Sequence, residues 1–549
     1  SFGCTPISKV VPPERHPAVM VWPLLPLVAE GIFRPSLAAA VLTAVACFKK
    51  GLKPWWGLGM LPAIALVCRV GRALKGPQTR PAGRCSREEY RSRLDAASVA
   101  AKVPGPLRMY KATTSNTFRP QQIGARLQSQ QRLDLSGFVH VLEINMQELW
   151  CDIEACATFE TFTDEMLKVG LAPLVVPELR TITVGGAIVG IGVESSSFKH
   201  GFFHEGLLEA DILLASGDVI TVRPEGEHAE LFRTIPNSLG SFGYLLRLRM
   251  RVQKAGPLVR LEKIWCDSPG ALIEGLKNNC LRSDLDYVDA VALGEQGGML
   301  MLGSYAKQAP SDNKVKYYGL WPQFYPSIVE EGVDFITTED YIWRWDADWF
   351  WCTQIFPGLN FWIIRWLCGP HLLRSDTYKA FNDVMIKNVL EPFGLNKNEE
   401  LVIQDIEIPV DQAENYISEF LRVCPSGRIG KIKLRRKGLP ITVPIWLCPV
   451  KGTGFPLMPM AKDALYINFG FWDALEGAET KGGIAAGRVN RALEDLTTTL
   501  GGKKTLYSNA YFSEEEFYRL YNGEAYKKVK ELYDPTGRLR GWYERLAKS

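Results

Sequence analysis

The 549-residue sequence lacks the patterns by which metal centres, disulfide scaffolds and several enzyme classes are recognised. Its twelve cysteines contain no CxxC pair, and its six histidines form no cluster with zinc-ligand spacing. We therefore expect no metal at the functional site, no disulfide framework and a reducing environment. Walker A and G-x-S-x-G motifs are also missing, which leaves no sequence support for a P-loop NTPase or an α/β-hydrolase.

Acidic residues are scarce at the N-terminus, where eleven basic side chains face only two acidic ones up to Arg84. The whole chain has a formal net charge of +4, so its body is slightly acidic. This distribution argues against a nucleic-acid-binding body and indicates a basic segment at a membrane surface.

No uncharged run in this N-terminal segment reaches the roughly 20 residues that a spanning helix needs. The runs Pro35–Phe48 and Pro54–Cys68 have 14 and 15 residues, and basic side chains with Trp55 and Trp56 flank them. We expect residues 1–75 to anchor the chain to a membrane as a short hairpin or as interfacial helices. The alternative is a buried helical pair of a soluble domain. The chain starts with Ser rather than Met, which is compatible with a removed organelle transit peptide or with a trimmed chain.

The length predicts two or more domains. A polar Pro/Gly/Arg stretch opens a predicted linker over residues 76–104. Short strands then alternate with a few helices, with Ser216-Gly217 as a hairpin turn, and this pattern predicts an α+β fold with a mixed or antiparallel sheet. A polar–apolar alternation in "LLRLRMRVQKA" predicts a half-exposed strand. Further strands in "ELVIQDIEIPV", "ITVPIWLCPV" and "DALYINFGFWD" predict a second sheet.

A tryptophan-rich stretch, "YIWRWDADWFWCTQIF", lies between these sheets in the sequence. It is typical of a packed core, a membrane-facing patch or a cavity for a large apolar substrate. A buried charge needs a partner, so we expect Arg344 to pair with an acid.

The glycine-rich run "TVGGAIVGIGVESSSFKHG" (Thr183–Gly201) almost forms a dinucleotide fingerprint. Ser195 occupies the last position of the fingerprint, and the following "SSSFKHGFFHEG" reads as a loop, so a Rossmann turn is not expected. The glycines still permit main-chain N–H groups to approach a phosphate. Two more small-residue loops, Tyr110–Pro120 and Pro236–Leu245, suggest a long cofactor threaded among the three, although any one loop taken alone favours a simple turn.

The run Pro177–Ser197, with "LLASGDVITVRP" and "IPNSLGSFGYLLRLRMRV" after it, resembles the FAD-binding domain of the vanillyl-alcohol-oxidase, or PCMH-type, flavoproteins. Within these proteins it is most similar to the delta-24 sterol reductase branch and its bacterial FAD-dependent relatives. The stretches "VIQDIEIPV" and "PIWLCPV" and the C-terminal tail extend the resemblance over roughly residues 105–540.

This resemblance implies a two-part FAD-binding domain over 105–255, a substrate-binding cap with an antiparallel sheet over 256–500, and a C-terminal segment, 501–549, that returns to their interface. It also implies an apolar, sterol-like substrate, NADPH as the electron donor and an endoplasmic-reticulum membrane. The first loop contains no histidine, so we expect non-covalent FAD. The residues that the resemblance places at the cofactor are Thr113, Thr114, Ser115, Asn116, Pro177, Thr183, Gly185, Gly186, Gly190, Gly192, Ser195, Ser196, Ser197, His200, Gly201, Val219, Ile220, Gly240 and Gly243.

The proton donor for such a reduction must be a titratable or hydroxyl group. Strand alternation places Asp405 and Glu407 on one face, where they are candidates or simply the wet side of the sheet. Tyr507 and Tyr511 alternate onto one face of "LYSNAYF", as candidates or as part of a core strand. An accessory subunit of a larger organellar membrane complex, with the flavoprotein fold but little catalysis, is the alternative function, and a mitochondrial or other organelle membrane the alternative location. A sugar-acid or aldonolactone oxidase fits the apolar cap less well.

Overall fold

The computed structural model describes residues 83–112, 131–318, 323–347, 374–376, 399–424, 435–436, 439–440, 444–476, 480–481, 484–485 and 487–546. The predicted membrane segment, 1–75, and the predicted first cofactor loop, Thr113 to Asn116, lie outside these residues. Among the described helices, none has the length and apolar character needed to cross a membrane.

The first sheet has six strands in the order β3-β4-β8-β6-β7, with β5 also paired to β8, and every pair is antiparallel. The strands are β3 (Val141–Asn145), β4 (Trp150–Glu154), β5 (Leu171–Pro173), β6 (Leu207–Leu214), β7 (Val219–Val222) and β8 (Gly243–Lys254). The helices α4 (Phe159–Leu167), α5 (Val184–Gly190), α6 (Ser197–His200) and α7 (Ala229–Thr234) and the 3₁₀ turn η3 (Phe203–Gly206) belong to the same part of the chain. The predicted β6–β7 hairpin is confirmed, and Gly217 adopts the positive φ of 91° that its turn requires.

The second sheet has nine strands in the order β12-β13-β9-β11-β10-β17-β18-β14-β21. Its strands are β9 (Leu258–Cys266), β10 (Tyr287–Ala292), β11 (Gly298–Ala306), β12 (Val315–Lys316), β13 (Gly332–Thr337), β14 (Glu399–Pro409), β17 (Ile445–Lys451), β18 (Leu465–Glu476) and β21 (Lys503–Lys504). All pairs are antiparallel except β12 with β13. The three strands predicted after residue 400 are thus confirmed as β14, β17 and β18.

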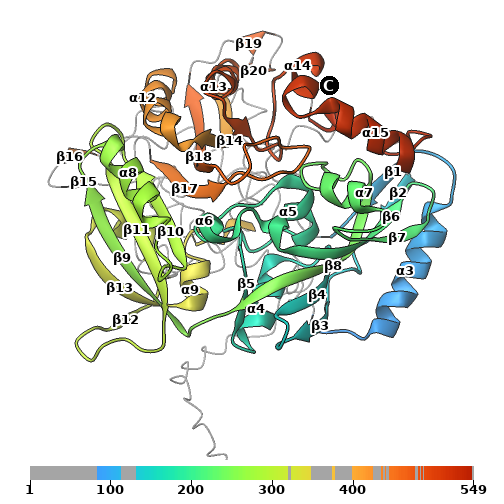
Figure 1. Cartoon of the computed structure of the whole chain (residues 1–549), viewed down its shortest axis with the longest axis horizontal. Helices are drawn as coiled ribbons and strands as arrows, with labels where there is room; N and C mark the ends of the chain where they lie inside the picture. The colour runs from blue at the N-terminus through green and yellow to red at the C-terminus, as the bar shows by residue number, and fades with distance from the viewer. Residues whose placement is uncertain are drawn as a thin grey trace, which may run out of the picture.

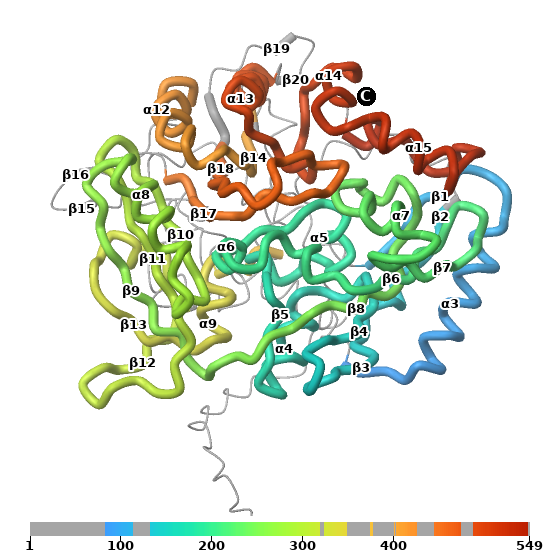
Figure 2. The backbone as a smooth tube through the Cα atoms, in the orientation of Figure 1, coloured from blue at the N-terminus to red at the C-terminus, as the bar shows by residue number. Residues whose placement is uncertain are grey.

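The helices after residue 256 are α8 (Pro269–Asn279), α9 (Thr338–Ile342), α12 (Ala413–Val423), α13 (Arg488–Thr499), α14 (Glu514–Leu520) and α15 (Gly523–Tyr533). Three small two-stranded sheets lie outside the two large ones: β1 (Leu107–Tyr110) with β2 (Gln131–Asp134), β15 (Arg435–Arg436) with β16 (Leu439–Pro440), and β19 (Thr480–Lys481) with β20 (Ile484–Ala485). Helix α15 contacts α7, so the C-terminus returns to the first sheet, as the red and green segments of Figure 2 show. The fold is α+β, as predicted, and the domain limits given above stay predictions.

The predicted linker over 76–104 stays a prediction, but the structure shows a 15-residue helix within it, α3 (Arg87–Ala101), because Ser86 and Glu89 form a capping box at its start. The predicted half-exposed strand is confirmed in the second half of β8, where buried apolar residues alternate with more exposed polar ones. Arg247 departs from this pattern. Arg247 is 5% exposed because its guanidinium pairs with Asp152, Glu209 and Asp211 on the neighbouring strands.

One apolar cluster joins the two sheets. It combines Leu179, Ile191 and Val193 from the glycine-rich region with buried side chains of the second sheet, including Trp446 and Val450. In Figure 1, α5 and α6 lie between the teal and green strands of the first sheet and the orange strands β17 and β18. The glycine-rich run therefore lies at the junction of the two sheets.

Candidate functional site

The glycine-rich run forms a short helix rather than the expected loop. Thr183 is the N-cap of α5, and its Oγ1 accepts a hydrogen bond from Gly186 N (3.3 Å). Lys111 Nζ donates to the same Thr183 Oγ1 at 2.7 Å. The following segment, also expected to be a loop, contains α6 and η3. The N–H groups of Val184 and Gly185 donate to Ala157 O (2.9 Å) and Ala155 O (2.8 Å), so the Lys111 ammonium is the group at the start of α5 that suits an anion.

The glycines of the predicted cofactor set differ in what a side chain would meet. A Cβ at Gly185 would lie 2.8 Å from Ala155 O, one at Gly192 2.9 Å from Pro177 Cγ, and one at Gly243 2.7 Å from Leu213 O. These three positions need glycine for packing within the protein.

Gly186 and Gly190 lie in a different environment. A Cβ at Gly186 would approach Thr183 Oγ1 (2.8 Å) and Lys111 Nζ (3.9 Å), whereas a Cβ at Gly190 would lie an ordinary 3.7 Å from Tyr507 Cβ. The structure thereby brings the predicted catalytic Tyr507 next to the predicted cofactor residue Gly190, although more than 300 positions separate them in the sequence.

The three serines of the run are buried, and their hydroxyls already have protein partners. Ser196 Oγ donates to Leu174 O (2.8 Å), Ser197 Oγ accepts from Glu194 N (3.0 Å), and Ser195 Oγ lies 3.3 Å from the hydroxyl oxygen of Tyr341. Their geometry favours a role in shaping the run. Gly201 has a positive φ of 71° and ends α6.

The two histidines near the run are held differently. His200 Nε2 lies 3.1 Å from Gln253 Oε1, and burial lowers the pKa of its ring. His204 packs against Phe202 and Phe455, and burial lowers its pKa to about 3, so it is neutral at physiological pH. Neither ring nitrogen of His204 has a hydrogen-bond partner among the described residues.

The remaining predicted cofactor residues lie on the first sheet and its turns. Val219 and Ile220 are half-buried on β7, at the edge of the sheet. Gly240 has a positive φ of 75° in the turn before β8.

The segment with Tyr507 and Tyr511 is irregular, so the expected core strand is wrong. Exposure nevertheless alternates along it: Tyr507, Asn509 and Tyr511 are half-buried, and the residues between them are buried. Its shape is fixed by a buried pair, in which Lys504 Nζ donates to Glu494 Oε1 at 2.7 Å and also to Asn509 O.

Tyr511 is held by the same pair and by α13. Its backbone N–H donates to Glu494 Oε2 (3.0 Å). Its ring packs directly against Gly487, because a Cβ at that position would lie only 2.1 Å from Tyr511 Cε1. Burial raises the pKa of the Tyr511 hydroxyl, which is therefore protonated at neutral pH.

Asp405 and Glu407 are buried, so the alternative that they form the wet side of the sheet is wrong. Asp405 is 8% exposed and Glu407 fully buried. Glu407 Oε1 accepts from Asn468 Nδ2 (3.0 Å). Burial raises the pKa of both carboxyls well above the usual range, which favours their protonated forms.

Arg344 is paired with acids, as expected, and its partners come from distant parts of the chain. Its Nη2 donates to Glu194 Oε1 (2.7 Å) in the glycine-rich run and to Asp289 Oδ2 (2.9 Å) on β10. Trp446 Nε1 also donates to Asp289 Oδ2 (3.0 Å). The sequence alone gave no indication of Glu194 or Asp289, because their connection exists only in the folded chain.

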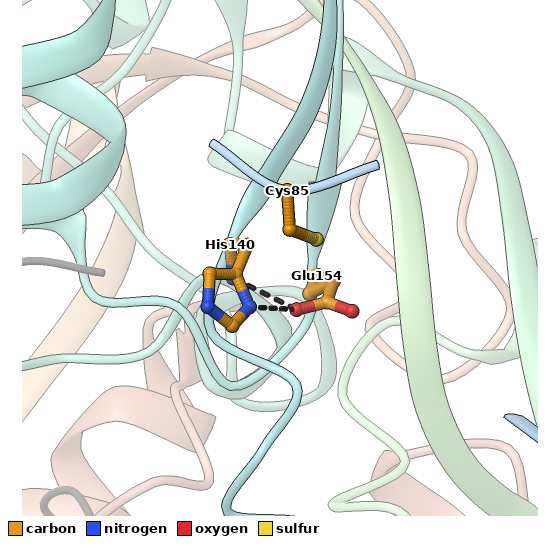
Figure 3. Close-up of side chains that lie close together, drawn as sticks. All are labelled: Cys85, His140 and Glu154. Atoms are coloured by element: carbon orange, nitrogen blue, oxygen red, sulfur yellow. Dashed lines mark hydrogen bonds and ion pairs between the residues drawn. The ribbon is translucent and has the colours of Figure 1, made fainter. Parts of the chain in front are cut away.

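Cys85, His140 and Glu154 form a cluster of side chains of the kinds that bind metal ions (Figure 3). One possible metal-ligand atom of each lies within 4.8 Å of the other two. His140 Nδ1 lies 2.9 Å from Glu154 Oε2, and Arg93 pairs with Glu154 Oε1. Arg93 Nη2 also donates to Cys85 Sγ (3.0 Å). Because a guanidinium already neutralises Glu154, we interpret this cluster as an ion-pair network.

A protein-family profile described as an FAD binding domain matches residues 116–223. Over 461 residues the chain is 26% identical to the delta(24)-sterol reductase of Arabidopsis thaliana, covering 76% of each chain. It is 25% identical over 421 residues to the delta(24)-sterol reductase of Homo sapiens, covering 74% of this chain and 76% of that one. The chain is an FAD-dependent oxidoreductase.

A third relative matches a shorter part of the chain. Cytokinin dehydrogenase 8 of Oryza sativa subsp. indica is 34% identical to this oxidoreductase, but over only 119 residues, or 22% of each chain. The similarity to the sterol reductases extends over much more of the chain.

The charge of Lys111, beside the start of α5, fits the phosphates of FAD. Lys111 has no carboxylate partner among the described residues, and burial lowers the pKa of its ammonium. A buried ammonium of this kind is best satisfied by an anion. Lys111 lies in the predicted loop Tyr110–Pro120 but was not among its predicted cofactor residues; a lysine just before a Thr/Ser/Asn run was the available signal.

Proposed function

We propose that this oxidoreductase reduces a carbon–carbon double bond of a sterol-like or other apolar lipid substrate, with FAD bound non-covalently. The observation that carries the proposal is the extent of the similarity to proteins named delta(24)-sterol reductases. It covers about three quarters of the chain, well beyond the 108 residues of the FAD-binding match. A second sheet with a strongly aromatic core, including Trp345, Trp446 and Tyr341, also suits an apolar substrate.

The cofactor-binding residues proposed for this chain are the first loop, Thr113 to Asn116, and the start of α5, with Thr183, Gly186 and Lys111. Gly190, which has no side chain, is proposed to leave room for the cofactor beside Tyr507. Bound FAD supplies hydride transfer at its N5 atom. We propose NADPH as the reductant.

The chain itself must supply the proton for the second carbon of the double bond. Asp405 is proposed for this role, because burial raises the pKa of its carboxyl and so favours the protonated form that a proton donor needs. Tyr507, next to Gly190, and Tyr511 are proposed to hold the substrate or the flavin through their hydroxyls. The Lys504–Glu494 pair positions both tyrosines by fixing the backbone between them.

We further propose that residues 1–75 hold the protein on a membrane. The endoplasmic reticulum is proposed from the resemblance to the sterol reductases, with a mitochondrial or other organelle membrane as the alternative. The comparisons lend no support to an accessory subunit without catalysis, since the relatives are named as reductases and a dehydrogenase.

Anaerobic reduction of the purified holoprotein by NADPH tests the function directly. We expect the flavin absorbance to bleach with NADPH and to return on addition of a sterol with a C24 double bond, with the saturated sterol recovered by mass spectrometry. The same sterol without the double bond is the control and should leave the flavin reduced. Bleaching without reoxidation by any unsaturated sterol or lipid would refute the proposed substrate class, and a protein that binds no FAD would refute the proposal altogether.

A further inference from the structure

Two successive residues of the glycine-rich run, Glu194 and Ser195, are bound to groups of the second sheet and to the residues after α9. Arg344 Nη2 donates to Glu194 Oε1 (2.7 Å) and to Ser195 Oγ (3.4 Å). The same nitrogen donates to Asp289 Oδ2 on β10 (2.9 Å). The backbone N–H of Val288, also on β10, donates to Ser195 O (2.8 Å). One guanidinium and one backbone hydrogen bond thus join the run to the second sheet.

Two residues of β17 strengthen this connection. Trp446 Nε1 donates to Asp289 Oδ2 (3.0 Å). The thiol of Cys448 donates to the backbone oxygen of Glu194 (2.9 Å). We call the set of Arg344, Asp289, Trp446, Cys448 and Glu194 the junction network. Each of these residues is at most 4% exposed, so water does not compete for their hydrogen bonds.

The junction network adds direction to an otherwise apolar contact between the two sheets. The apolar cluster at the junction excludes water, but hydrophobic burial is non-directional and tolerates small displacements. Replacing a buried ion pair by well-packed apolar residues of similar size is often neutral or stabilising. Stability alone therefore does not explain two acids and a guanidinium at this position. The planar guanidinium, with its fixed donor directions, instead suits a role in fixing one arrangement of the run and the sheet.

The junction network lies between the two places to which the proposed reaction is assigned. Glu194 comes four positions after Gly190, which borders the proposed flavin position. On the other side, Trp446 and Asp405 are both paired with Gly470 in the second sheet. A Cβ at Gly470 would lie 3.1 Å from Trp446 Cε3 and 2.9 Å from Asp405 Oδ1. The indole of the network and the proposed proton donor therefore lie on the same face of the sheet.

We propose that Arg344 and Asp289 are positioning residues for hydride transfer. Through Glu194 they hold the run that borders the proposed flavin position against the sheet that carries Asp405. The role in hydride transfer rests on the proposed function, whereas the holding of the run does not. A displacement of about 1 Å that arises away from the chemistry can cost about 10²-fold in rate. Loosening the junction network should therefore slow the transfer although neither residue touches the reacting atoms.

Hydrogen–deuterium exchange of the holoprotein, followed by mass spectrometry, tests the network without turnover. The buried Val288 amide is protected as long as Ser195 O stays on it. Arg344→Lys keeps the charge but loses the planar donor geometry. Because hydrogen bonds to charged groups are strong, we expect a peptide with Val288 to exchange about tenfold faster in this variant. Amides of the β6–β8 ladder should exchange as in the wild type.

A second variant and a matched control complete this test. Asp289→Asn keeps the shape of the side chain and removes one charge, so it should accelerate Val288 exchange to a smaller extent, even where Arg344→Lys fails to fold. Tyr90→Phe removes a buried hydroxyl that donates to Asp211 Oδ2 (2.7 Å) in a different core cluster, and should leave Val288 exchange unchanged. Wild-type exchange at Val288 in the folded Asp289→Asn and Arg344→Lys variants would overturn the proposal.

Reoxidation of the reduced holoprotein by an unsaturated sterol tests the positioning role. In Arg344→Lys the rate constant per bound flavin should fall about 10- to 100-fold, with little change in the sterol concentration that gives half the maximal rate. A merely structural role would lower the flavin content or the folded fraction and leave the rate constant per bound flavin unchanged, as we expect for Tyr90→Phe.

The two measurements separate the possible failures. Faster exchange at Val288 with an unchanged rate constant per bound flavin would overturn the positioning role. A wild-type protein that reduces no unsaturated sterol or lipid, but whose Arg344→Lys variant exchanges faster at Val288, would refute the proposed function and support the holding of the run by the junction network.

Discussion

Adding one methyl group at Gly185 and at Gly190 should damage different properties of the protein. At Gly185 the new Cβ would lie 2.8 Å from Ala155 O and 2.9 Å from Ala155 Cβ, closer than atoms in a folded core tolerate. Overpacking of this kind costs about 1–3 kcal/mol. At Gly190 the nearest atom, Tyr507 Cβ, lies at 3.7 Å, so the methyl group meets no clash.

Helix propensity sharpens the contrast. Replacing glycine by alanine inside a helix stabilises it by up to about 1 kcal/mol, and both positions belong to α5. The flavin-depleted Gly190→Ala variant should therefore match or exceed the wild-type free energy of unfolding in urea, and Gly185→Ala should fall about 1–3 kcal/mol below Gly190→Ala.

Flavin content should show the opposite order. A methyl group at Gly190 would occupy part of the space beside Tyr507 in which we place the cofactor. Gly190→Ala should therefore retain less FAD after gel filtration, and the larger Gly190→Val should retain none. Gly185→Ala should keep its flavin at temperatures where it remains folded. Full flavin occupancy in Gly190→Val would refute the placement of the cofactor at this end of α5, and equal stability of the two alanine variants would refute the packing argument.

Three further predictions concern charged groups. Lys111→Met should weaken FAD retention at least several-fold without lowering the unfolding free energy, measured by flavin titration of the apoprotein; unchanged affinity would exclude Lys111 from the phosphate site. Burial and neighbouring acids raise the pKa of Asp164 to about 6, so the folded state binds its proton more tightly than the unfolded state. Stability is therefore lost as the pH rises from about 4 to 6, and Asp164→Asn should exceed the wild type by up to about 3 kcal/mol at pH 7 and match it below pH 4 in urea unfolding. Arg247→Met should cost about 3–5 kcal/mol by leaving Asp211 buried with its main cation removed, and Asp211→Asn should restore part of it.

The strands and the fold class could be predicted because local patterns determine them. The β6–β7 hairpin follows from a Ser-Gly turn between apolar runs, and β14, β17 and β18 follow from their apolar and β-branched residues. The helix α3 was missed although its capping box is visible at Ser86 and Glu89, because the surrounding Pro/Gly/Arg composition suggested a linker.

Other features depend on pairing across the fold and could not be read locally. The arginines of β8 alternate with apolar residues exactly as exposed side chains would, and only the acids on β4 and β6 explain why Arg247 is buried. Asp405 and Glu407 likewise alternate with apolar residues as exposed side chains would, and only the folded structure shows that they are buried. The position of Tyr507 beside Gly190 depends on how the C-terminal segment crosses the first domain, which no local pattern encodes.

The acids at the junction of the two sheets also bear on whether the chain retains chemistry. Each buried carboxyl without a cation costs free energy relative to an apolar residue of similar size. A subunit kept only for its shape gains nothing from the buried Asp405 and Glu407, since leucine or glutamine would pack there at lower cost. Arg344 compensates Glu194 and Asp289, whereas no cation of the described residues pairs with Asp405 or Glu407. Buried acids that reduce stability without such a partner are typical of catalytic sites, which favours retained chemistry over a purely structural role.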